Sequence, residues 1–110
     1  MATRKKDRPK PKLADKPRWD VAKRTLYFRG VIVKRFKQPS ENQEAILAEL
    51  DAKGWPPRID NPLYDNDKAK REERMHDGIK NLNLHQRNRM IHFGGDGYGT
   101  GIIWELIEEK

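Results

Sequence analysis

The clearest pattern of apolar and polar positions lies in residues 90–107, the last fifth of the chain. β-branched and aromatic residues flank a loop over residues 94–101 that contains five of the chain's eight glycines. This composition predicts two antiparallel strands joined by a long glycine-rich turn. Apolar and more polar positions alternate in the second strand, so one face should point toward the core. That face consists of Ile102, Trp104 and Leu106.

A second pair of strands is expected nearer the start of the chain. Residues 25–28 and 31–36 are rich in strand-forming side chains, and Arg29-Gly30 between them predicts a compact hairpin turn. Alternation along the second of these strands places Val31 and Val33 on one face, and we expect both in the core. The sequence leaves the register of the other positions in this strand open.

The segment after these strands has the signals of an amphipathic helix. Ser40 and Gln43 form a capping-box pattern, in which the serine hydroxyl accepts the third helical amide and the glutamine side chain reaches back. Lys53 and Gly54 should end the helix, a cation in the last turn followed by a residue that tolerates a left-handed cap. The apolar stripe of this helix consists of Ile46, Leu47 and Leu50.

A second helix is expected from about Asp67 to Leu84. It follows a connector, residues 56–62, whose three prolines exclude a regular helix. Gly78 lies beside the apolar stripe of the second helix, and its missing side chain predicts a close approach to the first helix. The stripe, at the helical spacing of four and three, consists of Met75, Ile79 and Leu82.

Composition and charge add a separate N-terminal segment to this picture. The chain is 37% charged, with a mean hydropathy of −1.08 and a net charge of +7. Residues 1–18 contain eight Lys/Arg and two Asp, and therefore six of the seven net charges, together with three prolines. So few apolar residues cannot offset the entropy cost of ordering. We expect a disordered basic arm over residues 1–18 and one folded domain over residues 19–110.

The residue inventory argues against an enzyme. There is no cysteine, and the three histidines lack metal-ligand spacing, so we expect neither a metal nor a cofactor. The glycine loop lacks the Gly-Lys-Ser/Thr ending of a phosphate loop, and the single serine is the expected helix cap. No apolar run approaches a membrane span, and the basic start lacks the apolar stretch of a signal peptide. A protein of the bacterial cytoplasm or nucleoid, with no membrane association, is expected.

Function then has to be sought in binding surfaces, first on the second helix. A helix followed at once by a protruding hairpin is how a winged helix meets a nucleic acid duplex. Arg74, Lys80 and Asn81 share the side opposite the apolar stripe. Arginine reads guanine and asparagine reads adenine through paired hydrogen bonds, so this side can be a recognition surface. The alternative is an ordinary solvated face stabilised by mixed charges.

The glycine hairpin and the basic arm would add contacts to the nucleic acid backbone. As a wing, the hairpin brings bare backbone close to phosphates, with Tyr98 and Thr100 as donors, although Asp96 at its tip is unfavourable there. The alternative is a long turn without function. The arm can follow phosphates or serve only solubility. Its leading cations are Arg4, Lys5, Lys6 and Arg8.

The order of strands, capped helix, connector, basic helix and glycine hairpin resembles the effector domain of OmpR/PhoB-type response regulators. The residues that carry the resemblance are Leu26–Gly30 with Val33, Gln43–Leu47, Ile79–Leu82 and Ile91–Trp104. The resemblance implies a winged helix with an N-terminal sheet and sequence-specific DNA binding. Two departures matter. The prolines of residues 56–62 replace the family's middle helix, and no receiver domain precedes the chain, so phosphorylation control is not implied.

Together these patterns predict an α+β winged-helix fold with an N-terminal β-hairpin, two main helices and a C-terminal glycine-rich β-hairpin, preceded by the disordered basic arm. The predicted function is that of a small transcriptional regulator that binds double-stranded DNA. Its predicted contacts are the four arm cations and Lys70, Arg74, Lys80, Asn81, Arg87, Arg89, Tyr98 and Thr100. The alternatives are a protein–protein interaction module, or RNA or ribosome association through the arm. A neutral or acidic surface on the second helix and wing would favour the interaction module.

Overall fold

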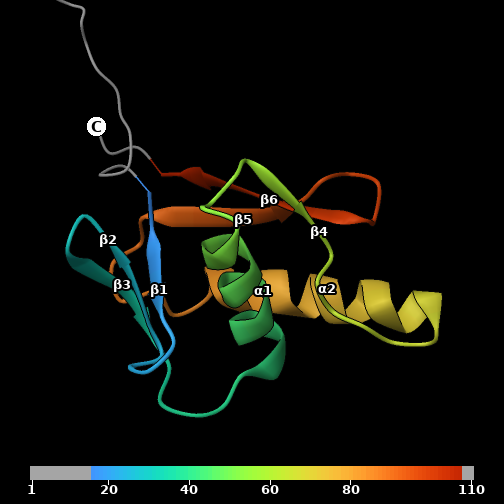
Figure 1. Cartoon of the computed structure of the whole chain (residues 1–110), viewed down its shortest axis with the longest axis horizontal. Helices are drawn as coiled ribbons and strands as arrows, with labels where there is room; N and C mark the ends of the chain where they lie inside the picture. Colours follow the sequence, from blue (N-terminus) through green and yellow to red (C-terminus); the bar gives the residue numbers. More distant parts are fainter. Residues whose placement is uncertain (1–15, 108–110) are drawn as a thin grey trace, which may run out of the picture.

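Two small antiparallel sheets pack against two helices in the computed structural model, which describes residues 16–107 (Figure 1). The elements follow one another in the order β1, β2, β3, α1, β4, α2, β5 and β6. Helix α1 contacts both β1 and α2, and α2 runs along β5. The predicted α+β class is confirmed, and the sheets differ from the prediction in the ways described below.

Sheet A consists of β1 (Arg18–Asp20), β2 (Thr25–Phe28) and β3 (Val31–Arg35), in that spatial order. The predicted hairpin of β2 and β3 is present. It is not the whole N-terminal element, because β1 pairs antiparallel with β2 along the other edge. The predicted hairpin is therefore extended by a third strand, β1, which at three residues is too short for sequence alternation to reveal.

The beginning of the described chain is held against the body. Arg18, which the sequence analysis assigned to the arm, is the first residue of β1 and pairs with Tyr27. Lys16 donates from Nζ to the carbonyl oxygen of Gly54 at 3.0 Å. The predicted arm contacts Arg4, Lys5, Lys6 and Arg8 lie outside the described residues.

The inward face of β3 differs from the prediction at one valine. Val33 is fully buried, as expected, but Val31 is 39% exposed. The register of β2 with β3 shifts between Leu26 and Tyr27, where β3 contains an extra residue that forms a β-bulge. The bulge turns the consecutive residues Val33 and Lys34 both inward and leaves Val31 at the exposed turn end. Simple alternation cannot predict this arrangement.

Helix α1 (Glu41–Ala52) buries its predicted stripe but begins differently. Ser40 occupies the N-cap position, and its side chain makes no capping hydrogen bond. The carboxylate of Glu44 accepts the backbone N–H of Ser40 at 2.9 Å instead. Gln43 accepts a hydrogen bond from Lys34 Nζ at 2.8 Å. The predicted capping box is wrong because Gln43 binds the buried lysine and a carboxylate one position later reaches back to Ser40.

Helix α2 (Lys68–Asn83) matches the predicted second helix to within one residue at each end. Asp67 caps it by accepting the N–H of Ala69 at 2.8 Å. A Cβ on Gly78 would lie 2.7 Å from Cδ1 of Ile46, so the predicted close approach to α1 is confirmed. The predicted stripe is buried throughout: Met75, Ile79 and Leu82.

Sheet B contains a strand that the sequence analysis did not predict. The glycine-rich hairpin is confirmed as β5 (Ile91–Gly95) and β6 (Gly101–Leu106), and we call the turn between these strands, residues 95–101, the wing loop. β4 (Arg58–Asp60) pairs with the other side of β6, which gives the order β4-β6-β5. β4 comes from the connector, whose prolines at 56, 57 and 62 flank the strand and do not interrupt it.

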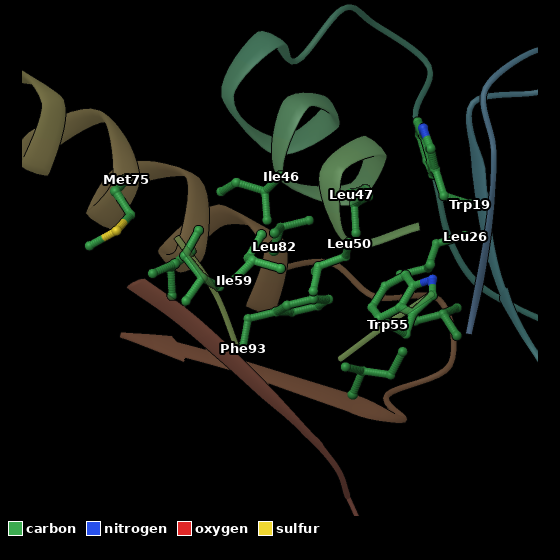
Figure 2. Packing of buried hydrophobic residues seen from close by; sticks show 14 of the residues in the cluster. Trp19, Leu26, Ile46, Leu47, Leu50, Trp55, Ile59, Met75, Leu82 and Phe93 are labelled. Atoms are coloured by element: carbon green, nitrogen blue, oxygen red, sulfur yellow. The ribbon is translucent and has the colours of Figure 1, made fainter. Parts of the chain in front are cut away.

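One core joins the helices and both sheets (Figure 2). Phe93 of β5, Leu50 of α1 and Leu82 of α2 meet there, each at most 1% exposed. Trp55 and Trp104 pack edge to face with their ring centroids 5.4 Å apart. The core therefore anchors sheet B, and with it the wing loop, to both helices.

Candidate functional site

Arg74 is the predicted recognition residue that the structure engages most fully. Its Nε donates to Asn42 Oδ1 at 3.1 Å, and its Nη1 donates to the carbonyl oxygen of Tyr64. Its Nη2 lies 3.6 Å from a carboxylate oxygen of Glu41. Arg74 thus ties α2 to α1 and to Tyr64, in the segment between β4 and α2, and its guanidinium is engaged within the fold.

The other residues predicted on this helix face differ in what they offer. Asn81 donates from Nδ2 to the carbonyl oxygen of Asp77, one turn earlier, at 2.9 Å. Lys70 and Lys80 are exposed, and within residues 16–107 their side chains have no hydrogen-bond or ion-pair partner. The helix therefore presents two separate lysines without the predicted arginine and asparagine beside them.

Asp96 organises the wing loop from within. One carboxylate oxygen accepts the N–H of Tyr98 at 2.8 Å, and the other accepts the Thr100 hydroxyl at 3.2 Å and Nε of Arg58 at 3.1 Å. These bonds, above all that from the Tyr98 amide, lower the pKa of Asp96 to about 2. Its side chain is only 7% exposed, so the charge is neutralised inside the loop and is not presented at the tip.

Arg58 of β4 fastens this loop to sheet B. Its guanidinium lies where a Cβ on Gly101 would be, so any other residue at position 101 would displace the guanidinium from this place. Hydrogen bonds to Asp60 and Asp96 raise the pKa of Arg58 and hold it charged. Thr100 is consequently used inside the loop, whereas the side chain of Tyr98 is 84% exposed.

The combined charge of α2 and the wing loop is zero. Residues 67–83 and 95–101 contain five Lys/Arg and five Asp/Glu. Because affinity for nucleic acids depends strongly on excess positive charge, this surface lacks the footprint expected of a recognition helix with its wing.

The excess positive charge of the described chain gathers elsewhere. Residues 31–39 and 84–92 contain no acidic residue. Asn88 joins the two segments, since its N–H donates to the Val33 carbonyl at 3.3 Å and its Nδ2 to the Ile32 carbonyl at 2.7 Å. Four exposed cations on these segments have side chains without a partner among the described residues. We call them the basic surface: Arg35, Lys37, Arg87 and Arg89.

The residues predicted to contact DNA therefore fall into three groups. Those engaged inside the fold are Arg74, Asn81 and Thr100. Those exposed singly are Lys70, Lys80 and Tyr98. Those on the segment that docks on β3 through Asn88 are Arg87 and Arg89, both exposed. Arg35 and Lys37 were not among the predicted contacts, because only the docking of Asn88 on β3 brings their strand next to the segment of Arg87 and Arg89.

Lys34 lies buried beside the basic surface, with 8% of its surface exposed. Its Nζ donates to Gln43 Oε1 at 2.8 Å and to the carbonyl oxygens of Asn81 and Leu84 at 2.5 and 2.8 Å. It thereby adds a hydrogen bond to the Asn81 carbonyl, which also accepts the Leu84 N–H at 3.1 Å, and one to the carbonyl of the C-cap residue Leu84. Burial lowers the pKa of Lys34 to about 8.

Raising the pH from about 8 to about 10.5 should stabilise the fold through Lys34. The pKa is about 8 in the folded chain and 10.5 without burial, so between these values the unfolded chain binds more protons. The gain is at most about 3 kcal/mol and is absent below pH 8, where both states are protonated. Urea unfolding of the wild type and Lys34→Met over this range measures it. The free energy of unfolding of the wild type should rise with pH relative to that of Lys34→Met. If it does not, the prediction is wrong.

Comparison with known proteins gives no significant match to this chain. No protein-family model matches the sequence, and no curated protein or solved structure is significantly similar to it. Within residues 16–107 no group of three or more His, Asp or Glu side chains is placed to hold a metal ion. No helix of the same residues has the length and apolar character needed to cross a membrane. Any inference about function therefore rests on the charge and geometry of the described residues.

Proposed function

We propose that this chain is a small nucleic-acid-binding protein that holds the phosphate backbone of double-stranded DNA through the basic surface. The observation that carries the proposal is the meeting of two acid-free segments that display four unpartnered cations. Arginine and lysine side chains of this kind supply most of the sequence-independent affinity for a duplex. The six Lys/Arg of residues 1–15, against two Asp, would add to it.

A winged-helix frame is part of the proposal. It is supported by a helix, α2, that packs on the three-stranded sheet β4-β6-β5 and leads into a glycine-rich hairpin. The connector over residues 56–62, which contains β4, and the segment that leads from it to α2 would stand in place of the middle helix. In this frame we assign the wing loop a structural role, because its hydrogen-bonding side chains, except Tyr98, are used internally.

The proposal favours backbone contacts over base reading. The two side chains best suited to read bases, Arg74 and Asn81, donate hydrogen bonds within the fold. Phosphate contacts position a protein on DNA and carry no sequence information of their own. A transcriptional regulator must prefer its own DNA site over other sequences. The neutral surface of α2 does not favour such a preference.

The double variant Arg87→Ala/Arg89→Ala should weaken duplex binding about tenfold and lower the salt slope by about two, one for each arginine that no longer neutralises a phosphate. Fluorescence anisotropy with a labelled duplex at several salt concentrations measures both quantities. Lys68→Ala/Lys70→Ala is the matched control, because it removes the same charge from exposed positions at the start of α2. Its affinity should stay within about twofold of the wild type.

Two results would overturn the proposal. Equal losses in the two double variants would mean that net charge alone, and not the basic surface, sets the affinity. If no complex forms with any duplex at low salt, the proposed DNA-binding function is refuted.

A protein–protein interaction module is the second candidate, and two observations favour it. The first is the zero net charge of α2 and the wing loop, which is the sign expected of such a module. The second is a pair of exposed tyrosines. Tyr64 and Tyr98 are 72% and 84% exposed, and both lie near the neutral surface of α2 and the wing loop. Exposed tyrosines are enriched where proteins bind one another. Absence of duplex binding in the experiment above would favour this candidate.

A further inference from the structure

A hollow of about 280 Å³ opens between the end of β3, the start of α1 and the last turn of α2. It adjoins the basic surface, since Arg35 and Lys37 belong to both. Among residues 16–107, no carboxylate lines it. The lining side chains that matter here are Lys34, Arg35, Lys37, Gln43, Asn81 and His85.

Lys34 provides this hollow with a buried positive charge that no acidic group compensates. All three of its hydrogen bonds go to neutral oxygen atoms, those of Gln43, Asn81 and Leu84. A buried charge without a counter-charge is costly, and its lowered pKa reflects that cost. An anion in the hollow would supply the missing counter-charge.

The nearest carboxylates are directed elsewhere. Glu44 of α1 binds Arg24 at 2.8 Å and the amide of Ser40. Glu41 and Asp77 line an adjoining hollow, which shares Ser40 and Gln43 with this one, and neither of them is among the residues that line the hollow beside Lys34. The acidic groups around Lys34 therefore do not fill the role that an external anion would take.

Hydrogen-bond donors suited to phosphate oxygens are also present. Gln43 uses its Oε1 for Lys34, and its Nε2 has no partner among the described residues. The Ser40 hydroxyl makes only a long bond, 3.4 Å, to the carbonyl of Gln38. Ser40 and Gln43 line this hollow together with Arg35 and Lys37, so amide, hydroxyl and cationic donors are available to the several acceptor oxygens of a phosphate group.

We infer that this hollow is a seat for a single phosphate group, and in the bound state for one phosphate of the duplex backbone. The inference rests on the proposed function and adds the position at which one phosphate is held. It also accounts for the presence of a buried lysine, Lys34, beside the exposed cations Arg35 and Lys37. The exposed cations would attract the backbone, and the hollow would set its register on the protein.

Titration of the full chain with inorganic phosphate at constant ionic strength, followed by NMR, tests the seat directly. The Gln43 side-chain amide signals should shift and saturate with a Kd on the order of 1 mM. Arg35→Ala/Lys37→Ala should weaken this binding at least about tenfold. Lys68→Ala/Lys70→Ala, which removes the same charge far from the hollow, should leave it within about twofold.

A parallel titration with a short duplex separates this inference from the proposed function. Shifts of the same Gln43 signals by both ligands are the expected result. If the duplex binds while phosphate causes no saturable shift, or if both double variants lose phosphate equally, the seat is refuted and the proposed function stands. If phosphate saturates the signals and no duplex binds, the seat stands and the proposed function is refuted.

Discussion

Truncation of Phe93 to alanine is expected to lower the free energy of unfolding by about 3–5 kcal/mol, the range for removal of a fully buried aromatic ring. Phe93 is 1% exposed, and its ring points from β5 toward Leu50 of α1 (Figure 2). Asn83 holds the backbone on both sides, since its Oδ1 accepts the Phe93 N–H at 2.8 Å and its Nδ2 donates to the Phe93 carbonyl at 2.9 Å. With the backbone held this way, the site cannot easily collapse around the missing ring.

Urea unfolding followed by circular dichroism measures this loss. Phe93→Leu is the matched control, since it keeps an apolar side chain in place and should cost only about 1 kcal/mol. A domain of this size has a total stability of about 5–15 kcal/mol, so the alanine variant should be close to unfolding. A loss below about 1 kcal/mol would show that the ring is not the centre of the core.

Asp51→Ala is expected to be the second most damaging change, at about 2–4 kcal/mol. Asp51 Oδ1 accepts the backbone N–H of Trp19 at 2.9 Å and Nε1 of Trp55 at 3.1 Å. Both tryptophans are buried, at 6% and 2% exposure. Alanine would leave two donors with neither a protein acceptor nor easy access to water, and each unpaired donor costs about 1–3 kcal/mol.

Asp51→Asn distinguishes a lost acceptor from a lost charge. The amide oxygen of asparagine can still accept both hydrogen bonds, so the loss should be less than half of that for alanine. Denaturant unfolding of the three proteins at neutral pH compares them. Equal losses for asparagine and alanine would show that the negative charge, and not the acceptor oxygen, holds β1 against α1.

The elements with a long local signal were predictable. Helix α2 repeats its apolar residues over about two turns, from Met75 to Leu82, and the hairpin of β5 and β6 combines strand formers with a glycine cluster. Such patterns arise because one face of each element must be buried, whatever its partner. The close approach of Gly78 to Ile46 was also predictable, since a glycine costs a helix stability and is kept beside an apolar stripe where a neighbouring element needs the space.

The elements that depend on a distant partner were missed or misplaced. β4 has three residues, and Ile59 is buried only because β6 passes beside it. Ser40 was expected to cap α1 with Gln43, but Lys34 competes for Gln43 through the bulge of β3. Neither partner is near in sequence, so neither contact leaves a periodic trace.

The candidate site shows the same division. Arg74 and Lys80 lie on the polar face of α2, as predicted, but only Lys80 is displayed, because Asn42 and Tyr64 hold the guanidinium of Arg74. Arg87 and Arg89 were among the predicted contacts, and Arg35 and Lys37 join them only through the docking of one loop on β3. Position on a helix wheel does not determine whether a charged side chain has a partner.

The sequence by itself determined the α+β class, both helices, the strands that carry apolar patterns and the excess of positive charge, because each is a local property of composition and spacing. Only the tertiary structure decided where that charge gathers, which cations are already paired and how Lys34 came to be buried. Those properties depend on which segments meet in space, and hydrogen bonds between residues up to 56 positions apart, such as that from Asn88 to Ile32, bring them together.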